Sequence, residues 1–472
     1  QMQDVPEMEN EGVAVSEFLF GVSDSDDISV RGIAITAVNE TDGQIQYSTD
    51  GGTAWTDLDD VNAANALLLS DSMDNRIRFL PAAGFLGAVD DAVTFRAWDQ
   101  TSGSNAAFAD ATNHGEDSAF SAELDTFAFA FTDIYWDGGG DGSSWDHALN
   151  WSTDQVPPAG ANVLIDDPAE ITVNLPVGGI SVGRLHAHDG LNHPSGTLFI
   201  FGQSRLFGSL SASTGSISAS GPEGSLLATG STSIHGTNVT AVNGGIVHLP
   251  ALTTYTGASD RNSNLTADGA GSRLLFDGMT ALNGADGAWQ FSVQATNGGV
   301  VEFGALQGIN SKNTHLISTG SGSLIRANLL TSWVDNRAGA KSELQLTDGG
   351  KVELNELQTI SNVSIRVEDG LQLRLPSLQS IDANTLESSD VVATDAGSLI
   401  ALPALNSIAG GRSGFGMNVS ATNGGGIVMP RLETMTRNVD LRSVGSGSLV
   451  DMPALLSWTD NDATAKSRFT VS

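Results

Sequence analysis

An internal repeat constrains the fold of this 472-residue chain more than any other feature of its sequence. Phrases such as VHLPALTTY, VELNELQTI and IALPALNSI recur, and each ends on an apolar residue that we take as the anchor of one unit. The anchors lie 21 to 27 residues apart, a period typical of chains whose units stack into a solenoid. They are Ile234, Tyr255, Leu282, Ile309, Trp333, Ile360, Ile381, Ile408, Met435 and Trp458.

The spacings between anchors also repeat. They run 21, 27, 27, 24 and 27 residues, then begin again as 21, 27, 27 and 23. Five unequal units therefore form a super-repeat of 126 residues, and the segment ATNGG at 295–299 returns one super-repeat later at 421–425. We expect such units to bury their apolar residues against one another, because no single unit can cover its own apolar stripe.

Within each unit, the positions eight, six and three residues before the anchor are apolar as well. The step of two is the period of a β-strand, and the following step of three indicates a corner. Glycine, often after asparagine, precedes the strand and supplies the positive φ of a turn. Proline recurs five residues before the anchor, where we expect the strand to end because proline has no N–H to donate. These prolines are Pro250, Pro376, Pro403, Pro430 and Pro453.

Two kinds of solenoid match this repeat. A helical solenoid is one of them, since units of this length with the pattern LPxLxxI resemble leucine-rich repeats. The units contain no amphipathic stretch of helical length and are rich in Gly, Ser, Thr and Asn, which favours a right-handed parallel β-helix. With strands about 4.8 Å apart, ten coils would rise roughly 45 Å.

The net negative charge of the chain limits the kinds of partner that it is expected to bind. Asp and Glu number 55 against 21 Lys and Arg, which argues against nucleic acid or an anionic membrane as a partner, because phosphates need positive charge to neutralise them. Calcium or another cation is the better candidate.

The chain has no cysteine, so disulfides and thiolate chemistry are excluded. No apolar run approaches the roughly 18 residues of a membrane span.

The charge is also unevenly distributed. Residues 1–150 hold 28 acidic and four basic side chains, whereas residues 151–472 hold 27 acidic and 17 basic ones, which indicates two kinds of domain. We predict an all-β chain with a β-sandwich at 1–132, a segment at 133–230 that leads into the solenoid and caps it, and a parallel β-helix at 231–472. Because the chain opens without Met and stops within a unit, we expect a piece of a longer protein.

Two resemblances add to this interpretation. The phrases VSDSDD, QYSTDGGTAW, IRFLPAAGFLG and VTFRAWDQTSG are similar to the cadherin-like tandem domain of giant bacterial surface proteins. The segment YWDGGGDGSSWDHALNWSTDQVPPAGANVLID resembles the opening of many secreted bacterial β-solenoid proteins. The first resemblance implies an immunoglobulin-like sandwich, often associated with calcium, and both imply a secreted or cell-surface location. Trp136, Trp145 and Trp151 would then cover the open end of the solenoid core.

The cadherin-like resemblance also implies a set of calcium ligands. Calcium takes six to eight oxygen ligands, mostly from carboxylates and carbonyls, and six acidic residues correspond to ligand-bearing ends in that pattern. They are Glu9, Glu11, Asp24, Asp26, Asp27 and Asp99. The alternative is a solvated acidic surface that binds no metal.

A second metal candidate lies in the segment LHAHDGLNH. His186, His188, Asp189 and His193 have a spacing that could hold zinc. Outward-facing polar residues on a solenoid strand are the simpler explanation.

An enzyme is a further alternative, because β-helices also host polysaccharide lyases and hydrolases. A lyase needs a basic residue and a hydrolase needs two carboxylates. We find no Arg, Lys or carboxylate set at one phase of successive units, which argues against both. Asp335 and Asp460 follow two anchors in a repeated loop, which indicates architecture rather than an active site.

We therefore expect an extracellular structural protein that forms fibres, or a segment of a giant cell-surface protein that tethers cells to surfaces. Its partners would be copies of itself or adjacent solenoid segments, with extracellular glycans as further candidates. An unpaired coil edge templates strand addition, so we expect end-to-end association. A glycan-binding adhesin and a β-helix polysaccharide lyase or hydrolase are the alternatives.

Overall fold

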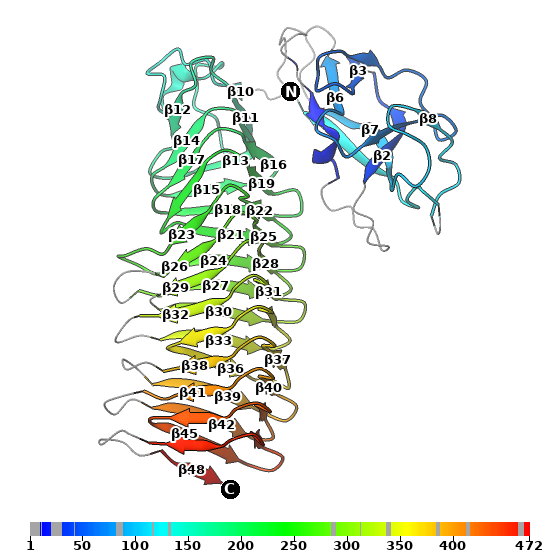
Figure 1. The fold of residues 1–472 in the computed structure, drawn as a ribbon. Coiled ribbons are helices and arrows are strands. Elements are labelled where there is room, and N and C mark those ends of the chain that lie inside the picture. Colours follow the sequence, from blue (N-terminus) through cyan, green and yellow to red (C-terminus); the bar gives the residue numbers. More distant parts are fainter. Residues whose placement is uncertain are drawn as a thin grey trace. The chain divides into compact units, whose positions relative to one another are not determined.

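The structure is a computed structural model of the whole chain, and it divides into two compact units, residues 1–135 and 136–472 (Figure 1). The described residues are almost entirely strands and turns. They are 10, 12–19, 31–41, 43–81, 88–115, 118–130, 134–284, 289–311, 313–336, 341–383, 388–411, 416–460 and 467–472.

The first unit is an antiparallel β-sandwich. One sheet has the strand order β1, β6, β3, β4, and the other has the order β8, β5, β2, β7, β9. A short 3-10 turn, η2 (Val15–Glu17), follows the first strand. The strands are β1 (Val13–Ala14), β2 (Gly32–Val38), β3 (Gly43–Ser48), β4 (Thr56–Asp57), β5 (Ala66–Ser70), β6 (Arg76–Pro81), β7 (Ala88–Trp98), β8 (Phe108–Ala109) and β9 (Asp125–Ala130).

The two sheets of the sandwich enclose one core. Ile33 and Ile35 of β2 point into it and meet Ile45 of β3 and Phe79 of β6, and all four side chains are fully buried. Alternate residues of a strand face the same side, so one apolar set serves one core. The predicted β-sandwich is confirmed, and the finer assignment to cadherin-like domains stays a prediction.

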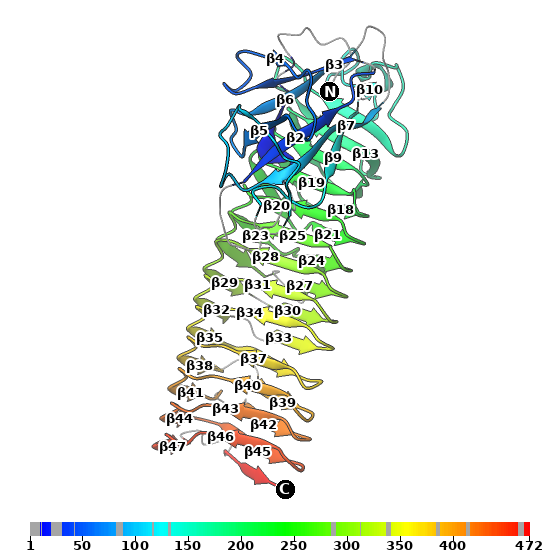
Figure 2. The same ribbon diagram turned by 90° about the vertical axis from the view of Figure 1, so that its right-hand side faces the viewer.

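The second unit is a parallel β-solenoid of about 12 turns, in which successive coils add strands to three faces (Figure 2). The short strand β10 (Ile134–Tyr135) ends the first unit. In the second unit, η3 (Ala148–Asn150), β11 (Ala161–Ile165) and β13 (Ile180–Ala187) come before the regular coils. β13 is long enough to pair with strands of two faces. Parallel coils thus begin inside the segment 133–230 that we predicted to lead into the solenoid.

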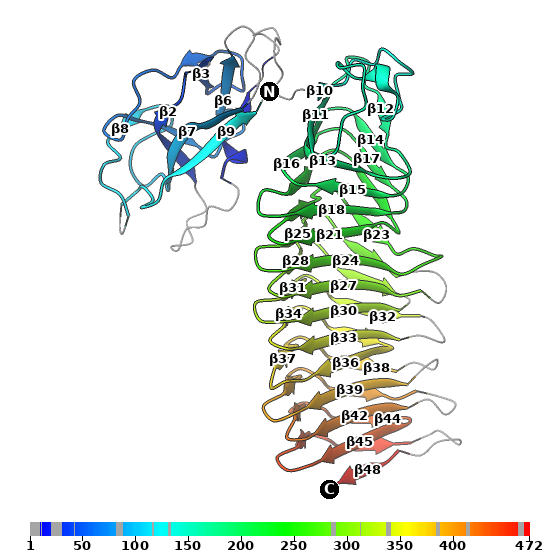
Figure 3. The same ribbon diagram turned by 180° about the vertical axis from the view of Figure 1, so that it is seen from behind.

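We name the three faces A, B and C. Face A, which is toward the viewer in Figure 3, comprises β15 (Thr197–Ile200), β18 (Ser216–Ser220), β21 (Asn238–Val242), β24 (Ser263–Asp268), β27 (Phe291–Thr296), β30 (Thr314–Thr319), β33 (Ser342–Thr347), β36 (Val363–Val367), β39 (Ser389–Thr394), β42 (Met417–Thr422), β45 (Val439–Val444) and β48 (Phe469–Val471). Face B comprises β16 (Gln203–Leu206), β19 (Ser225–Ala228), β22 (Ile246–His248), β25 (Arg273–Phe276), β28 (Val300–Phe303), β31 (Leu324–Arg326), β34 (Lys351–Glu353), β37 (Gln372–Arg374), β40 (Leu399–Ala401), β43 (Gly426–Val428) and β46 (Leu449–Asp451). Face C comprises β12 (Thr172–Asn174), β14 (Gly190–His193), β17 (Leu210–Ala212), β20 (Thr232–His235), β23 (Thr254–Thr256), β26 (Ala281–Asn283), β29 (Gly308–Ser311), β32 (Ser332–Asp335), β35 (Thr359–Ser361), β38 (Ser380–Asp382), β41 (Ser407–Ala409), β44 (Thr434–Thr436) and β47 (Ser457–Thr459).

The anchors form one column on face C. Ile234 pairs in register with Tyr255, Tyr255 pairs with Leu282, and the same alignment continues through Met435 to Trp458. The anchors from Ile234 to Met435 are buried in the solenoid core. The predicted repeat and the parallel β-helix are therefore confirmed. The helical alternative is wrong, since the described residues contain no α-helix.

The prolines mark the corner between faces B and C. The N–H of Leu252 donates to the carbonyl of Leu249 (3.2 Å) and closes a turn around Pro250. The corresponding bond closes the turns around Pro376 and Pro403. The fixed φ of proline suits the second position of such a turn, and β22 ends before Pro250 as predicted.

The corner between faces A and B alternates between two turn types. A short turn has Asn or Asp followed by two glycines, with positive φ at the first two residues. A long turn has one residue more and ends on serine. The short turns are 243–245, 297–299, 348–350 and 423–425, and the long turns are 269–272, 320–323, 395–398 and 445–448.

A serine hydroxyl joins each of these long turns to the short turn of the preceding coil. The hydroxyl of Ser272 accepts the N–H of Gly244 (2.9 Å) and donates to the carbonyl of Asp268 (2.6 Å). Ser272 is fully buried, so these bonds satisfy groups that water does not reach. The N–H acceptance recurs between Ser323 and Gly298, Ser398 and Gly370, and Ser448 and Gly424.

Close packing requires the last glycine of each short turn. A Cβ added at Gly299 would lie 2.1 Å from the carbonyl oxygen of Ala267 in the preceding coil. The same kind of approach, at 2.1 to 2.3 Å, occurs at Gly245, Gly350 and Gly425. Contact with neighbouring backbone, rather than a positive φ, therefore selects glycine at this position.

Three tryptophans pack at the start of the solenoid. The rings of Trp136 and Trp151 meet edge to face with centroids 5.0 Å apart, and those of Trp145 and Trp151 meet at 4.7 Å. The indole N–H of Trp151 donates to the carbonyl of Trp145 (2.7 Å). All three side chains are buried, and their role as a cover over the end of the core stays a prediction.

Gly299→Ala is expected to destabilise the solenoid by about 1–3 kcal/mol, because the new methyl group overlaps a carbonyl of the neighbouring coil. Gly308→Ala is the matched control, since a Cβ there meets only the hydroxyl of Ser332 at 3.8 Å. Thermal and urea unfolding of both variants measure the difference. Equal stability of the two variants would contradict the close approach.

Candidate functional site

The predicted calcium ligands fall mainly outside the described residues. Glu9, Glu11, Asp24, Asp26 and Asp27 lie in those segments. Asp99 is described, and its Oδ1 accepts the N–H and the hydroxyl of Thr101 at 2.8 and 2.7 Å. That arrangement is a local turn around one carboxylate. The calcium site stays a prediction.

The histidine segment at 186–193 is divided among separate structural contacts. The carboxylate of Asp189 accepts the N–H groups of Asp167 and Ile171 at 2.6 and 2.8 Å. His193 is buried and its Nε2 bonds the carbonyl of Ser216 (3.1 Å), while His188 stacks on Phe207. Among the described residues, no three His, Cys, Asp or Glu side chains are grouped to hold a metal.

Asp335 stabilises the repeated loop for which the sequence predicted a structural role rather than an active site. Its buried Oδ2 accepts the N–H and the hydroxyl of Ser342 at 3.0 and 2.8 Å, and the N–H of Asn313 at 3.1 Å. Asp460 makes the equivalent contact to the N–H of Ser467 (2.6 Å). The repeated aspartates thus close repeated loops between faces C and A.

Face B carries a charged column that sequence reasoning missed. Glu302, Arg326 and Glu353 are aligned in successive coils. Arg326 bonds both carboxylates, with its Nε 2.7 Å from Glu353, and Arg273 bonds Glu302 at 2.6 Å. The column mixes two residue types, so it lies outside the expectation that no Arg, Lys or carboxylate set occupies one phase of successive units. Opposite charges alternate in the column because like charges would repel at the spacing of adjacent strands.

The side chains of the charged column pair with one another between coils, which is a structural rather than a catalytic role. Each carboxylate faces a guanidinium, and the side chains are partly exposed, with 22% of Glu302 and 41% of Arg326 accessible. Exposed pairs of this kind contribute about 0–1 kcal/mol each. A search for one recurring residue type misses such a column, whereas a search for alternating charge would find it.

The outward side chains of face C are small and mostly neutral, whereas face A combines neutral side chains with ion pairs such as that between Arg366 and Glu343 (3.2 Å). On face A, threonines stack across coils, with hydroxyl contacts of 3.0 Å between Thr319 and Thr347 and between Thr394 and Thr422. The residues beside the anchors on face C are mainly Gly, Ala, Ser and Thr. Face C therefore forms a long surface of small side chains.

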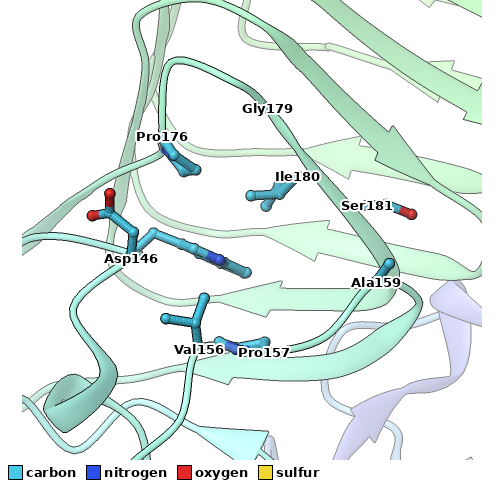
Figure 4. A pocket seen from close by; sticks show the side chains of 9 residues that line it. Asp146, Val156, Pro157, Ala159, Pro176, Gly179, Ile180 and Ser181 are labelled. Atoms are coloured by element: carbon cyan, nitrogen blue, oxygen red, sulfur yellow. The ribbon is translucent and has the colours of Figure 1, made fainter.

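An apolar pocket of about 240 Å³ lies near the cap of the solenoid. Val156, Pro157, Pro176 and Ile180 face one space, whereas the carboxylate of Asp146 and the hydroxyl of Ser181 point outward (Figure 4). The pocket has no charged group directed inward, so it provides little to orient a ligand.

A second opening lies on face B, between β34 and β37. Its volume is about 350 Å³, and its lining includes Lys351, Glu353 and Arg374. It is the more polar of the two openings.

No protein-family model, curated protein or solved structure matches this chain. Among the described residues, no helix has the length and apolar character needed to cross a membrane.

Asp335→Ala is expected to cost roughly 3 kcal/mol of folding free energy, because it leaves the buried N–H and O–H of Ser342 and the N–H of half-buried Asn313 without their acceptor. Asp460→Ala removes the equivalent contact where the residue is exposed, so about 1 kcal/mol or less should be lost. Urea unfolding of the two variants compares them. A larger loss for Asp460→Ala would contradict this account of the loop.

The stability of the solenoid should fall in mild acid partly because of His193. Burial lowers the pKa of this imidazole below its usual 6.5, so the unfolded chain takes up a proton more readily. The contribution of the neutral His193 imidazole to the free energy of unfolding is complete above pH 6.5 and is lost as the pH falls below 6.5. His193→Gln should reduce the difference in melting temperature between pH 7 and pH 5. His235→Gln, at an exposed position of face C, is the control and should leave that difference unchanged.

Proposed function

We propose that this chain is a structural element of a secreted or cell-surface protein, in which the solenoid acts as a stiff rod. Its partners are copies of itself or adjacent solenoid segments. The rod either builds a fibre end to end or tethers a cell to a surface.

The observation that carries this proposal is the unbroken register of the anchor column on face C, from Ile234 to Trp458. Adjacent coils are joined by backbone hydrogen bonds, so stretching or bending the solenoid breaks several bonds at once. This cohesion needs no disulfide, which suits a chain without cysteine. At about 4.8 Å per coil, roughly 12 coils make a rod of about 55 Å.

Association follows from the same geometry. A coil presents the same pattern of N–H and C=O groups to each neighbour, so a coil of matching cross-section continues both the ladders and the core. That neighbour is either further solenoid or a second copy of the chain.

The extracellular location and the calcium ion rest on the resemblance of residues 1–132 to cadherin-like domains and on the acidic composition of that segment. Calcium would rigidify the sandwich by neutralising clustered carboxylates. We propose no enzymatic role, because the carboxylates of the charged column on face B, Glu302 and Glu353, are engaged in ion pairs with Arg273 and Arg326.

In millimolar calcium, we expect the full chain to form assemblies larger than a monomer, and these should dissociate in chelator. Size-exclusion chromatography with light scattering measures the mass, and magnesium at the same concentration is the control for ionic strength. A monomer in every condition would contradict self-assembly and favour a tethered adhesive stalk.

The proposed calcium ligands are tested separately by titration calorimetry. A variant with Asp24, Asp26 and Asp27 all changed to Asn should lose the calcium heat, whereas Asp59→Asn with Asp60→Asn, at exposed positions of the same unit, should retain it. Calcium heat that survives the triple change would place the site elsewhere.

A further inference from the structure

The strand ladder of face B is interrupted at one place. From β22 to β34 each strand pairs with the next, and from β37 to β46 the pairing resumes. No pairing joins β34 to β37, and β37 begins a separate four-stranded sheet. Faces A and C continue past this point, because β33 pairs with β36 and β35 pairs with β38. One side of the solenoid is therefore open between two adjacent coils.

The interruption of the ladder coincides with a break in the alternation of short and long turns. The short turn at 348–350 is followed by another short turn, Asp369-Gly370-Leu371, where the alternation requires a long one. The turn 369–371 contains no serine. The carboxylate of Asp369 instead accepts the N–H of Asp348 (3.0 Å), the first residue of the preceding short turn rather than its glycine. Leu371 occupies the position that is glycine in the four other short turns.

Leu371 explains why the strands separate. Its glycine counterparts lie so close to the preceding coil that a Cβ would be 2.1 to 2.3 Å from a carbonyl oxygen. A leucine side chain at this position needs more room than the intact ladder leaves, so the coil moves away on this face. Val352, at the edge of the opening, is 9% exposed, whereas its neighbours Val301 and Ile325 in the same column are fully buried.

The opening has a volume of about 350 Å³ and a mixed lining. Val352 and Leu371 form an apolar floor, and Asn355 and Gln372 are exposed amides at its rim. Lys351 and Arg374 are exposed cations that make no ion pair among the described residues. The carboxylate of Glu353 is already engaged by Arg326. Two available cations are notable in a chain of net charge −34.

The size of the opening limits its occupant. An inserted peptide strand would need about 4.8 Å of additional separation between the coils, which the continuous ladders of faces A and C prevent. A compact ligand with an anionic group suits the two cations, and hydroxyl groups suit the amides. Apolar C–H faces of a sugar ring suit the floor, and the volume is in the lower range of ligand sites.

We propose that the opening between β34 and β37 binds a saccharide unit that carries a carboxylate or a sulfate group. Lys351 and Arg374 hold the anion, and Asn355 and Gln372 bond the hydroxyls. Leu371 keeps the site open. This site is independent of self-assembly and remains testable if the chain forms no fibre.

The test uses ligand-observed NMR with the full chain and three probes, sodium glucuronate, glucose 6-sulfate and glucose. Glucuronate, glucose 6-sulfate or both should bind, and which of them binds identifies the anion. Glucose should bind at least about tenfold more weakly. Lys351→Gln and Arg374→Gln should each weaken binding about tenfold, as expected for the loss of a hydrogen bond to a charged group. Arg431→Gln, an exposed arginine elsewhere on the solenoid, should have no effect.

Leu371→Gly gives the decisive comparison. It restores the short-turn sequence and leaves every polar residue of the site in place, so binding should be lost as the ladder closes, with unchanged or higher melting temperature. Binding of neither anionic probe, an equal loss in Arg431→Gln, or full binding by a folded Leu371→Gly variant would overturn the proposal.

Discussion

The parallel backbone ladder between coils is the constraint on which the rest of the solenoid depends. It places each residue about 4.8 Å from its counterparts above and below, so side chains form columns rather than isolated contacts. An inward column must be apolar along its length, as the anchors are. An outward column must avoid stacking like charges, and Glu302, Arg326 and Glu353 meet that condition by alternation. The same requirement accounts for the small neutral residues on face C.

The parts of the fold that could be predicted from the sequence are those that the ladder repeats. The position of Tyr255 relative to Ile234, for example, is set by a spacing that each later pair reproduces with changes only in loop length. Pro250 marks a corner because its missing N–H and fixed φ act locally. Ile77 and Phe79, in the phrase IRFLPAAGFLG, indicate a sandwich strand because alternation depends only on the strand itself.

The parts that could not be predicted depend on differences between neighbouring coils. The charged column contains two residue types, so it does not appear as a repeat of one. Leu371 is an ordinary turn residue until its glycine counterparts are aligned with it and their distance to the preceding coil is known. The connecting serines are equally inconspicuous, since Ser272 is one of many serines and its partner Gly244 lies 28 residues away. The predicted calcium ligands remain untested, because most of them lie outside the described part of the chain.

The alternation of short and long turns has a consequence for the super-repeat itself. Its first copy contains five coils, with turns in the order short, long, short, long, short, and the second copy begins again with a short turn. An odd number of alternating coils cannot be placed in tandem without two like turns meeting at the junction. The opening beside Leu371 lies at that junction. Parity therefore brings two like turns together at each junction of this five-coil unit, and that junction is where the residue that opens the ladder, Leu371, is found.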